Sequence, residues 1–178
     1  MITHTLKTIG LVSLLAGFGT TAMAATDGSL GTSSSASINI NLTVLEQLQI
    51  HSLQDINMQV AEDSNPANAS AVSQGCVYAN TPSGYYSLKS TSRNGQEQNG
   101  QYQLKGSSGQ QVGYSLSAAS NGSSYGSLAN GQSQTFKASN TQDCSGGKNL
   151  NIKMQLDPNA ELKPGSYHDV NYLQVNPI

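Results

Sequence analysis

Short stretches in which apolar and polar residues alternate, separated by turn-forming residues, fill this chain from Val72 to its end. A period of two places alternate side chains on opposite faces of a β-strand, whereas a helix needs a period near 3.6. No stretch longer than about ten residues keeps the helical period. The most regular alternations cover 112–116 and 150–156, and Gly, Asn and Pro turns separate neighbouring stretches at the spacing of a β-sandwich. The sequence therefore predicts an all-β sandwich.

Another alternating stretch lies close to the start of the chain, at residues 37–44. As a strand it has one apolar face, formed by Ile38, Ile40, Leu42 and Val44. The Gly-, Ser- and Thr-rich residues just before it are typical of a flexible lead. Clean alternation also predicts a strand over 55–60 and a last strand over 167–175.

The first 24 residues have the pattern of a secretory signal peptide. Lys7 supplies a positive charge, residues 9–18 are apolar, and small residues precede a cleavage point between Ala24 and Ala25. The apolar run is about half the roughly 20 residues that a membrane span needs. We therefore expect a signal peptide over 1–24, a flexible lead over 25–37, and one sandwich domain over 38–178 that includes the strand at 37–44.

The two cysteines, Cys76 and Cys144, both lie in the exported part, so they can pair in only one way within the chain. We expect a disulfide, which would stabilise the fold by roughly 4 kcal/mol in the chain-entropy model. Two free thiols are the open alternative. A zinc site has little support, because no histidine pair accompanies the cysteines.

No residue pattern predicts an enzyme, a cofactor site or a metal site. Of the three histidines, His51 has no nearby ligand pattern, and His168 and Asp169 are neighbours that point to opposite faces of a strand. The turn at 157–159 could offer oxygens to calcium but is more typical of an ordinary turn. Charged residues make up only 10% of the chain, with 8 Lys and Arg against 10 Asp and Glu, so no basic patch indicates nucleic-acid binding.

Eight tyrosines occur, and most have the apolar neighbours two positions away that indicate packing in a sheet. Tyr125 differs, because it lies in a loop rich in Gly, Ser and Asn. It is the one tyrosine expected as a possible ligand contact.

Several stretches together resemble a known family, the subunits of archaic (Csu-type) chaperone–usher pili with a spore-coat-protein-U-like domain. These stretches are 37–44, 75–78 with 84–88, 101–105 with 112–116, and the ending 163–169 followed by 173–175. The ending is the most specific, because its P-G-x-Y-x-D residues, Pro164 to Asp169, are similar to the P-x-G-x-Y-x-D pattern of the family. The chain departs from the family in having no cysteine at 45–53.

The resemblance implies an immunoglobulin-like sandwich that lacks its last strand. In the family, a periplasmic chaperone fills the resulting groove until the N-terminal extension of the next subunit replaces it, and an outer-membrane usher assembles the fibre. Ile38, Ile40, Leu42 and Val44 would then plug the groove of a neighbouring pilin. The implied function is a structural subunit of an extracellular fimbria that supports adhesion and biofilm formation after export through the periplasm.

Three other interpretations remain open at this stage. The chain could be a secreted or surface-exposed adhesin module that binds a glycan or host surface near Tyr125. It could be an exported enzyme whose groups converge from distant loops. Residues 37–44 could also be simply the first strand of a complete, self-sufficient sandwich.

Overall fold

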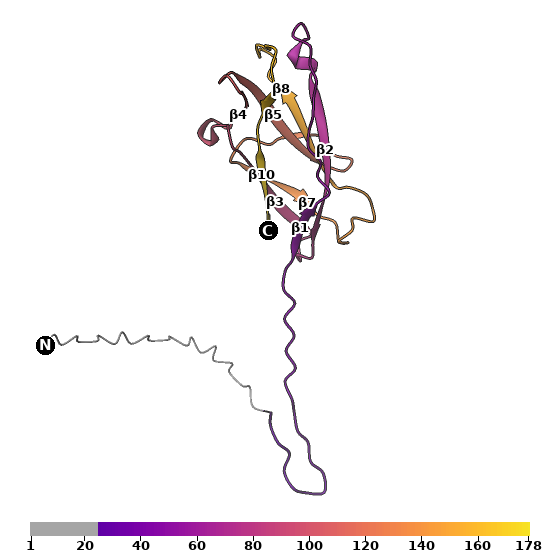
Figure 1. The fold of residues 1–178 in the computed structure, drawn as a ribbon. Helices are drawn as coiled ribbons and strands as arrows, with labels where there is room; N and C mark the ends of the chain where they lie inside the picture. Colours follow the sequence, from indigo (N-terminus) through magenta and orange to yellow (C-terminus); the bar gives the residue numbers. More distant parts are fainter. Residues whose placement is uncertain (1–24) are drawn as a thin grey trace, which may run out of the picture. The chain divides into compact units, whose positions relative to one another are not determined.

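The computed structural model describes residues 25–178, so the predicted signal peptide lies outside the described residues. The chain divides into an N-terminal segment that ends at Val44 and a compact unit, Leu45–Ile178 (Figure 1). The compact unit holds all ten strands found in the described chain and two short 3-10 turns, η1 (Pro66–Asn68) and η2 (Glu97–Asn99). The described residues contain no α-helix, as the absence of a helical period predicts.

The strands of the compact unit form two antiparallel sheets. The larger sheet has the order β1-β2-β8-β5-β4-β9, with β6 added to β5, and the smaller sheet has the order β10-β3-β7. The strands of the larger sheet are β1 (Leu48–His51), β2 (Ser70–Ala79), β4 (Tyr102–Gly106), β5 (Gln111–Ser120), β6 (Gly126–Ser127), β8 (Leu150–Leu156) and β9 (Tyr167–His168). The smaller sheet contains β3 (Tyr85–Ser92), β7 (Ser133–Lys137) and β10 (Asn171–Pro177).

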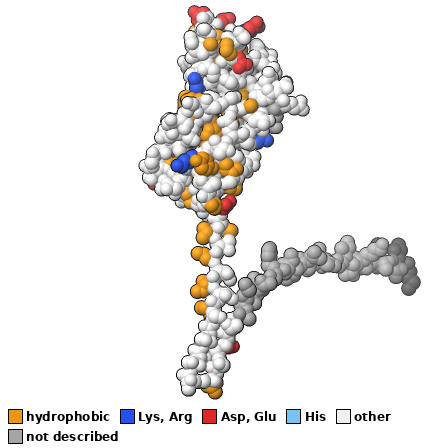
Figure 2. All heavy atoms as spheres, turned by 180° about the vertical axis from the view of Figure 1, so that it is seen from behind, with side chains coloured by type: hydrophobic (Ala, Val, Ile, Leu, Met, Phe, Trp, Pro, Cys, Tyr) orange, Lys and Arg blue, Asp and Glu red, His pale blue; other side chains and the backbone are white. Residues whose placement is uncertain are grey.

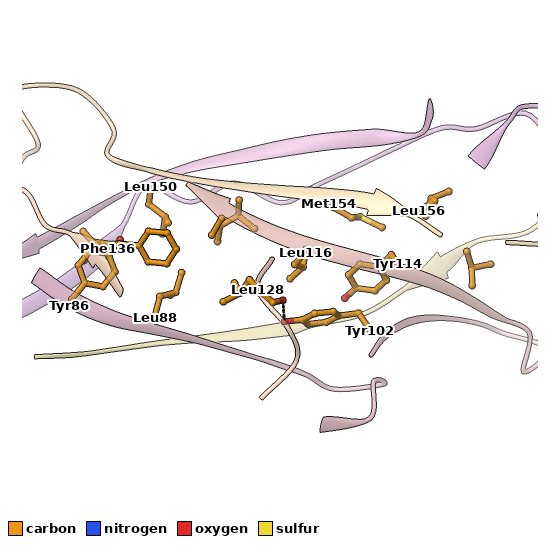
Figure 3. Close-up of a cluster of buried hydrophobic side chains, with 14 residues drawn as sticks. Tyr86, Leu88, Tyr102, Tyr114, Leu116, Leu128, Phe136, Leu150, Met154 and Leu156 are labelled. Carbon is orange, nitrogen blue, oxygen red and sulfur yellow. Dashed lines mark hydrogen bonds between the residues drawn. The ribbon is translucent and has the colours of Figure 1, made fainter. Parts of the chain in front are cut away.

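A hydrophobic core fills the space between the sheets. Apolar side chains of β5 and β8 contribute one side of the core, and those of β3 and β7 contribute the other (Figure 3). Tyr86 packs beside Phe136 with ring centroids 6.0 Å apart, and Tyr102 packs beside Tyr114 at 5.3 Å. The Tyr102 hydroxyl donates a hydrogen bond to the Leu128 carbonyl at 2.9 Å. The predicted all-β, immunoglobulin-like sandwich is confirmed.

The disulfide joins Cys76 on β2 to Cys144 in the loop before β8, with 6.0 Å between the Cα atoms. On β2 it is Val77 that faces the core, so Cys76 lies on the opposite face, where the loop that carries Cys144 covers it. His51 supports the same loop, because its Nε2 donates to the Gln142 carbonyl at 2.8 Å. Cys76, Cys144 and His51 therefore serve the fold.

The prediction of one last strand over 167–175 is wrong in one respect, because the chain changes sheets within it. β9 pairs with β4 in the larger sheet, and β10 pairs with β3 in the smaller one. Asp169 lies at the crossing and accepts hydrogen bonds from the backbone N–H groups of Asn94 at 3.1 Å and Val170 at 2.7 Å. It also accepts one from the Ser92 hydroxyl at 2.5 Å. The carboxylate thus satisfies donors that the change of sheet leaves without a ladder partner.

The strand predicted over 55–60 is absent, although its alternation is visible in the burial of its side chains. Ile56 and Met58 are half-buried and pack against the core, while Asp55, Asn57 and Gln59 are exposed. No strand of the described chain pairs with this segment. Period two therefore identified its inward face correctly, but a strand also requires a partner.

Candidate functional site

The outermost strand of the smaller sheet, β10, has one unpaired edge. Along its whole length it pairs with β3, from Asn171 opposite Ser92 to Pro177 opposite Tyr86. No strand in residues 25–178 is hydrogen-bonded to its other edge, although β1 lies near β10. Leu173 and Val175 point inward and are only half-buried against the core. An exposed edge of this kind offers free backbone N–H and C=O groups to another strand.

An open cleft with apolar side chains at its base adjoins the start of β10 and reaches the core. It consists of two neighbouring cavities of about 540 and 530 Å³, both lined by Ile56, Leu104, Met154 and Tyr167. Apolar side chains of β4, β5 and β8 line it, namely Leu104, Val112, Leu116, Ile152, Met154 and Leu156. All of these except Leu104 belong to the buried core of the sandwich. The cleft is therefore a place where the two layers of the sandwich do not close over the core.

Two segments form the walls of the cleft, and only the first of them has no strand partner. Residues from the 53–62 segment line one side, and residues from the 162–173 segment line the other. The second wall is braced internally, because the Tyr167 hydroxyl donates to the Lys163 carbonyl, four residues upstream, at 3.1 Å. This Tyr-to-backbone bond lies within the ending at 163–169, which gives that stretch a structural role.

A group of polar side chains lies where the cleft meets the start of β10. The Tyr114 hydroxyl donates to Asp169 Oδ2 at 2.6 Å, and Asn171 Nδ2 donates to the Tyr114 hydroxyl at 2.7 Å. Burial raises the pKa of Tyr114, and its hydrogen bond to Asp169 raises that pKa further. Tyr114 therefore stays a protonated donor at neutral pH. Asp169 is occupied by structural hydrogen bonds, and His168 beside it is exposed.

The N-terminal segment carries the four apolar residues of the predicted strand at 37–44. We call Ile38, Ile40, Leu42 and Val44 the plug residues; their exposed fractions are 72%, 86%, 86% and 73%. Within this segment, backbone hydrogen bonds at 3.2 and 3.1 Å join Thr26 and Ser37, whose hydroxyls also contact each other. Hydrophobic side chains follow one another along the extended segment (Figure 2). Four large apolar side chains in a row, all exposed to water, indicate a surface that binds a partner.

The remaining predicted site residues lie outside the cleft lining. Tyr125 is 44% exposed and lies in the turn between β5 and β6. Within residues 25–178, no group of three or more His, Cys, Asp or Glu side chains could hold a metal ion. The same residues include no helix with the length and apolar content of a membrane span.

The open cleft is the feature that sequence reasoning missed. In the sequence, the residues that line the cleft have the pattern of ordinary core positions. Those of its 53–62 wall have the pattern of an ordinary strand. A signal was present in the clean alternation at 55–60, but nothing in the sequence says that this stretch lacks a partner.

Comparisons with known proteins support the fold. No protein-family model matches the chain, and no curated protein matches it by sequence. Among solved structures, a chain from the chaperone–tip adhesin complex of CFA/I fimbriae is similar, with a TM-score of 0.55 and 16% sequence identity. The similarity covers 74% of this chain and 41% of that one. At this level of identity the likeness shows a shared β-sandwich fold.

Proposed function

We propose that this chain is a structural subunit of an extracellular fimbria, assembled by the chaperone–usher pathway through donor-strand exchange. The observation that carries the proposal is the presence, in one chain, of an open apolar cleft beside an unpaired strand edge and of an exposed row of plug residues. The plug residues of one subunit would enter the cleft of the next. The fimbrial origin of the similar structure supports this function.

The row of plug residues matches β10 in length and the base of the cleft in chemistry. Residues 38–44 and β10 each contain seven residues, which as strands extend over roughly 20 Å. A segment paired with β10 would turn its apolar face toward the cleft lining and its polar face toward solvent. Its second edge would lie beside the 53–62 wall, whose alternation already places Ile56 and Met58 inward. That wall would then gain the strand partner that it lacks.

Burial of the plug residues supplies the driving force. Moving one such side chain from water into an apolar site is worth about 1.5–3 kcal/mol, so four give on the order of 6–12 kcal/mol before the cost of association. Hydrogen bonds to the free edge of β10 would add to this gain. Such a contact joins the head of one subunit to the tail of the next and need not close into a ring, so it generates a fibre.

The open cleft is also the reason to include a chaperone among the partners. A free strand edge beside an open cleft with apolar side chains at its base favours aggregation. A periplasmic chaperone would cover the cleft after export, and an outer-membrane usher would exchange it for the next subunit. Cleavage between Ala24 and Ala25, display on the cell surface, and roles in adhesion and biofilm formation belong to the same proposal. So does the absence of enzymatic activity.

The test is a variant that lacks Thr26–Val44 and so keeps the cleft but has no plug residues. We expect this variant to remain monomeric when it is produced with the chaperone. A synthetic peptide with the sequence of residues 36–46 should then bind it and raise its melting temperature. The control peptide replaces all four plug residues by asparagine, which keeps the length but removes the apolar face.

The control peptide should bind far more weakly, because the face that it turns to the cleft carries asparagine side chains, whose burial against apolar groups without hydrogen-bond partners is unfavourable. Multimers formed by the deletion variant would overturn the proposal. Equal binding of the two peptides would also overturn it, because the match between the apolar face and the cleft is its physical basis.

A further inference from the structure

The outer face of the smaller sheet has a composition unlike that of a plain solvated face. On β3, β7 and β10, alternate residues turn away from the core and form this face: Tyr85, Ser87, Lys89, Thr91, Ser133, Thr135, Lys137, Tyr172, Gln174 and Asn176. None of the three strands contains Asp or Glu, although acids outnumber bases 10 to 8 in the whole chain. The face is therefore locally basic and rich in amide and hydroxyl groups.

Two exposed tyrosines lie toward opposite ends of this face. Tyr172 is 59% exposed and lies opposite Thr91, while Tyr85 is 44% exposed and lies at the other end of β3. Thr91 lies six positions after Tyr85 on β3, so the tyrosines are about 20 Å apart along the strands. That distance suits an extended chain of several sugar rings better than a single small molecule.

Each tyrosine has a lysine as a cross-strand neighbour. Tyr85 lies directly opposite Lys137, and Tyr172 is diagonal to Lys89, which is opposite Gln174. Directly opposite side chains start about 5 Å apart and diagonal ones about 7–8 Å, so each ring and its neighbouring ammonium can contact one ligand residue together. The face thus contains the same pair, one aromatic ring and one cation, twice.

Polar groups between the two pairs complete the surface. Gln174 Nε2 donates to Asn176 Oδ1 at 3.2 Å, which aligns two amides along β10. Their free donor and acceptor groups, with the hydroxyls of Ser87 and Thr135, can bind the hydroxyls of a sugar chain. A tyrosine ring offers an apolar surface and a polar tip, which suits the apolar face and polar edge of a pyranose.

We propose that this face binds an acidic polysaccharide. Tyr85 and Tyr172 stack on sugar rings near its two ends, and Lys89 and Lys137 pair with carboxylate or sulfate groups. The absence of acids from the three strands gives the face its charge complementarity with such a polymer. The site consists of strands of one subunit, so binding does not depend on the proposed donor-strand exchange. In a fibre, however, repeated copies of the site would strengthen binding.

The probe is alginate, an acidic polyuronate, with neutral dextran as the comparison polymer. The full exported chain should bind alginate with an affinity that falls as salt is added, and should not bind dextran. Tyr172→Ala should weaken alginate binding about five-fold, and Lys89→Gln about three-fold. Adding Tyr85→Ala to Tyr172→Ala should weaken it further.

The matched controls are Tyr125→Ala and Lys153→Gln, which change a tyrosine and a lysine associated with the larger sheet and should leave binding unchanged. The variant that lacks Thr26–Val44 should still bind alginate as a monomer, which separates this proposal from the assembly proposal. Equal binding to dextran, or an equal loss in the control variants, would overturn the proposed site. So would unaltered binding by Tyr172→Ala together with Tyr85→Ala.

Discussion

Replacing Ile40 by alanine tests most directly where residues 37–44 act. Ile40 is 86% exposed in the subunit, so the substitution removes little that stabilises the free chain. In the cleft of a neighbour the same change would remove three buried carbon groups. Burial of each is worth about 0.8 kcal/mol, so the change would cost roughly 2 kcal/mol of binding free energy. We therefore expect Ile40→Ala to weaken subunit association about thirty-fold while the melting temperature of the monomer stays unchanged.

The assay titrates peptides of residues 36–46 against the variant that lacks Thr26–Val44 and follows fluorescence anisotropy. The peptide with Ile40→Ala should show the thirty-fold rise in Kd, and the matched peptide with Asn39→Ala should bind nearly as tightly as the native sequence. In the full chain, Ile40→Ala should lower the yield of multimers and Asn39→Ala should not.

Two results would refute the reasoning. Equal effects of Ile40→Ala and Asn39→Ala would show that the alternation of this segment has no role in association. A melting temperature of the monomer lowered by several degrees in Ile40→Ala would show that Ile40 packs in its own domain, because core substitutions of this size cost about 2–5 kcal/mol. The segment would then be the first strand of a self-sufficient sandwich.

Three further predictions concern stability. Tyr86→Phe should raise the free energy of unfolding by about 1 kcal/mol in urea titrations, because the Tyr86 hydroxyl is buried without a hydrogen-bond partner in the described chain; a loss of stability would show that this hydroxyl is satisfied. Replacing Cys76 and Cys144 together by alanine should lower the free energy of unfolding by about 4 kcal/mol, measured the same way against the oxidised chain. Burial raises the pKa of Tyr86, Tyr102 and Tyr114 above the ordinary value near 10, so the folded state keeps protons that the unfolded state releases. Their contribution to stability is therefore complete below about pH 9 and falls as the pH rises above 10, and Tyr86→Phe should make that fall shallower.

The periodicity of the sequence predicted most strands and the direction of their side chains. Leu150–Leu156 alternates strictly, and the structure buries Leu150, Ile152, Met154 and Leu156 while their neighbours remain half-exposed. The cysteine count predicted the disulfide, since only one pairing exists. Alternation is a property of each strand by itself, and two cysteines allow one pairing. Both features can therefore be predicted without knowing which strands pair with each other.

Period two separated the tyrosines of β3 correctly but not the tyrosine of β10. Tyr86 shares its face with Leu88 and is fully buried, whereas Tyr85 shares its face with Ser87 and Lys89 and is 44% exposed. Tyr172 has an apolar residue, Val170, two positions before it, but it lies on the outer face of β10 and is 59% exposed. The proposed polysaccharide site on this face was therefore not visible in the sequence.

The sequence by itself determined that the chain is all-β, that its cysteines pair, and that residues 38–44 carry an apolar row beside a polar one. Only the tertiary structure decided that the chain changes sheets at Asp169, that β10 keeps a free edge, and that the alternating segment 55–60 lines a cleft instead of joining a sheet. The reason is that alternation encodes which face of a segment is apolar. Whether that face and its backbone find partners depends on strands far away in the sequence.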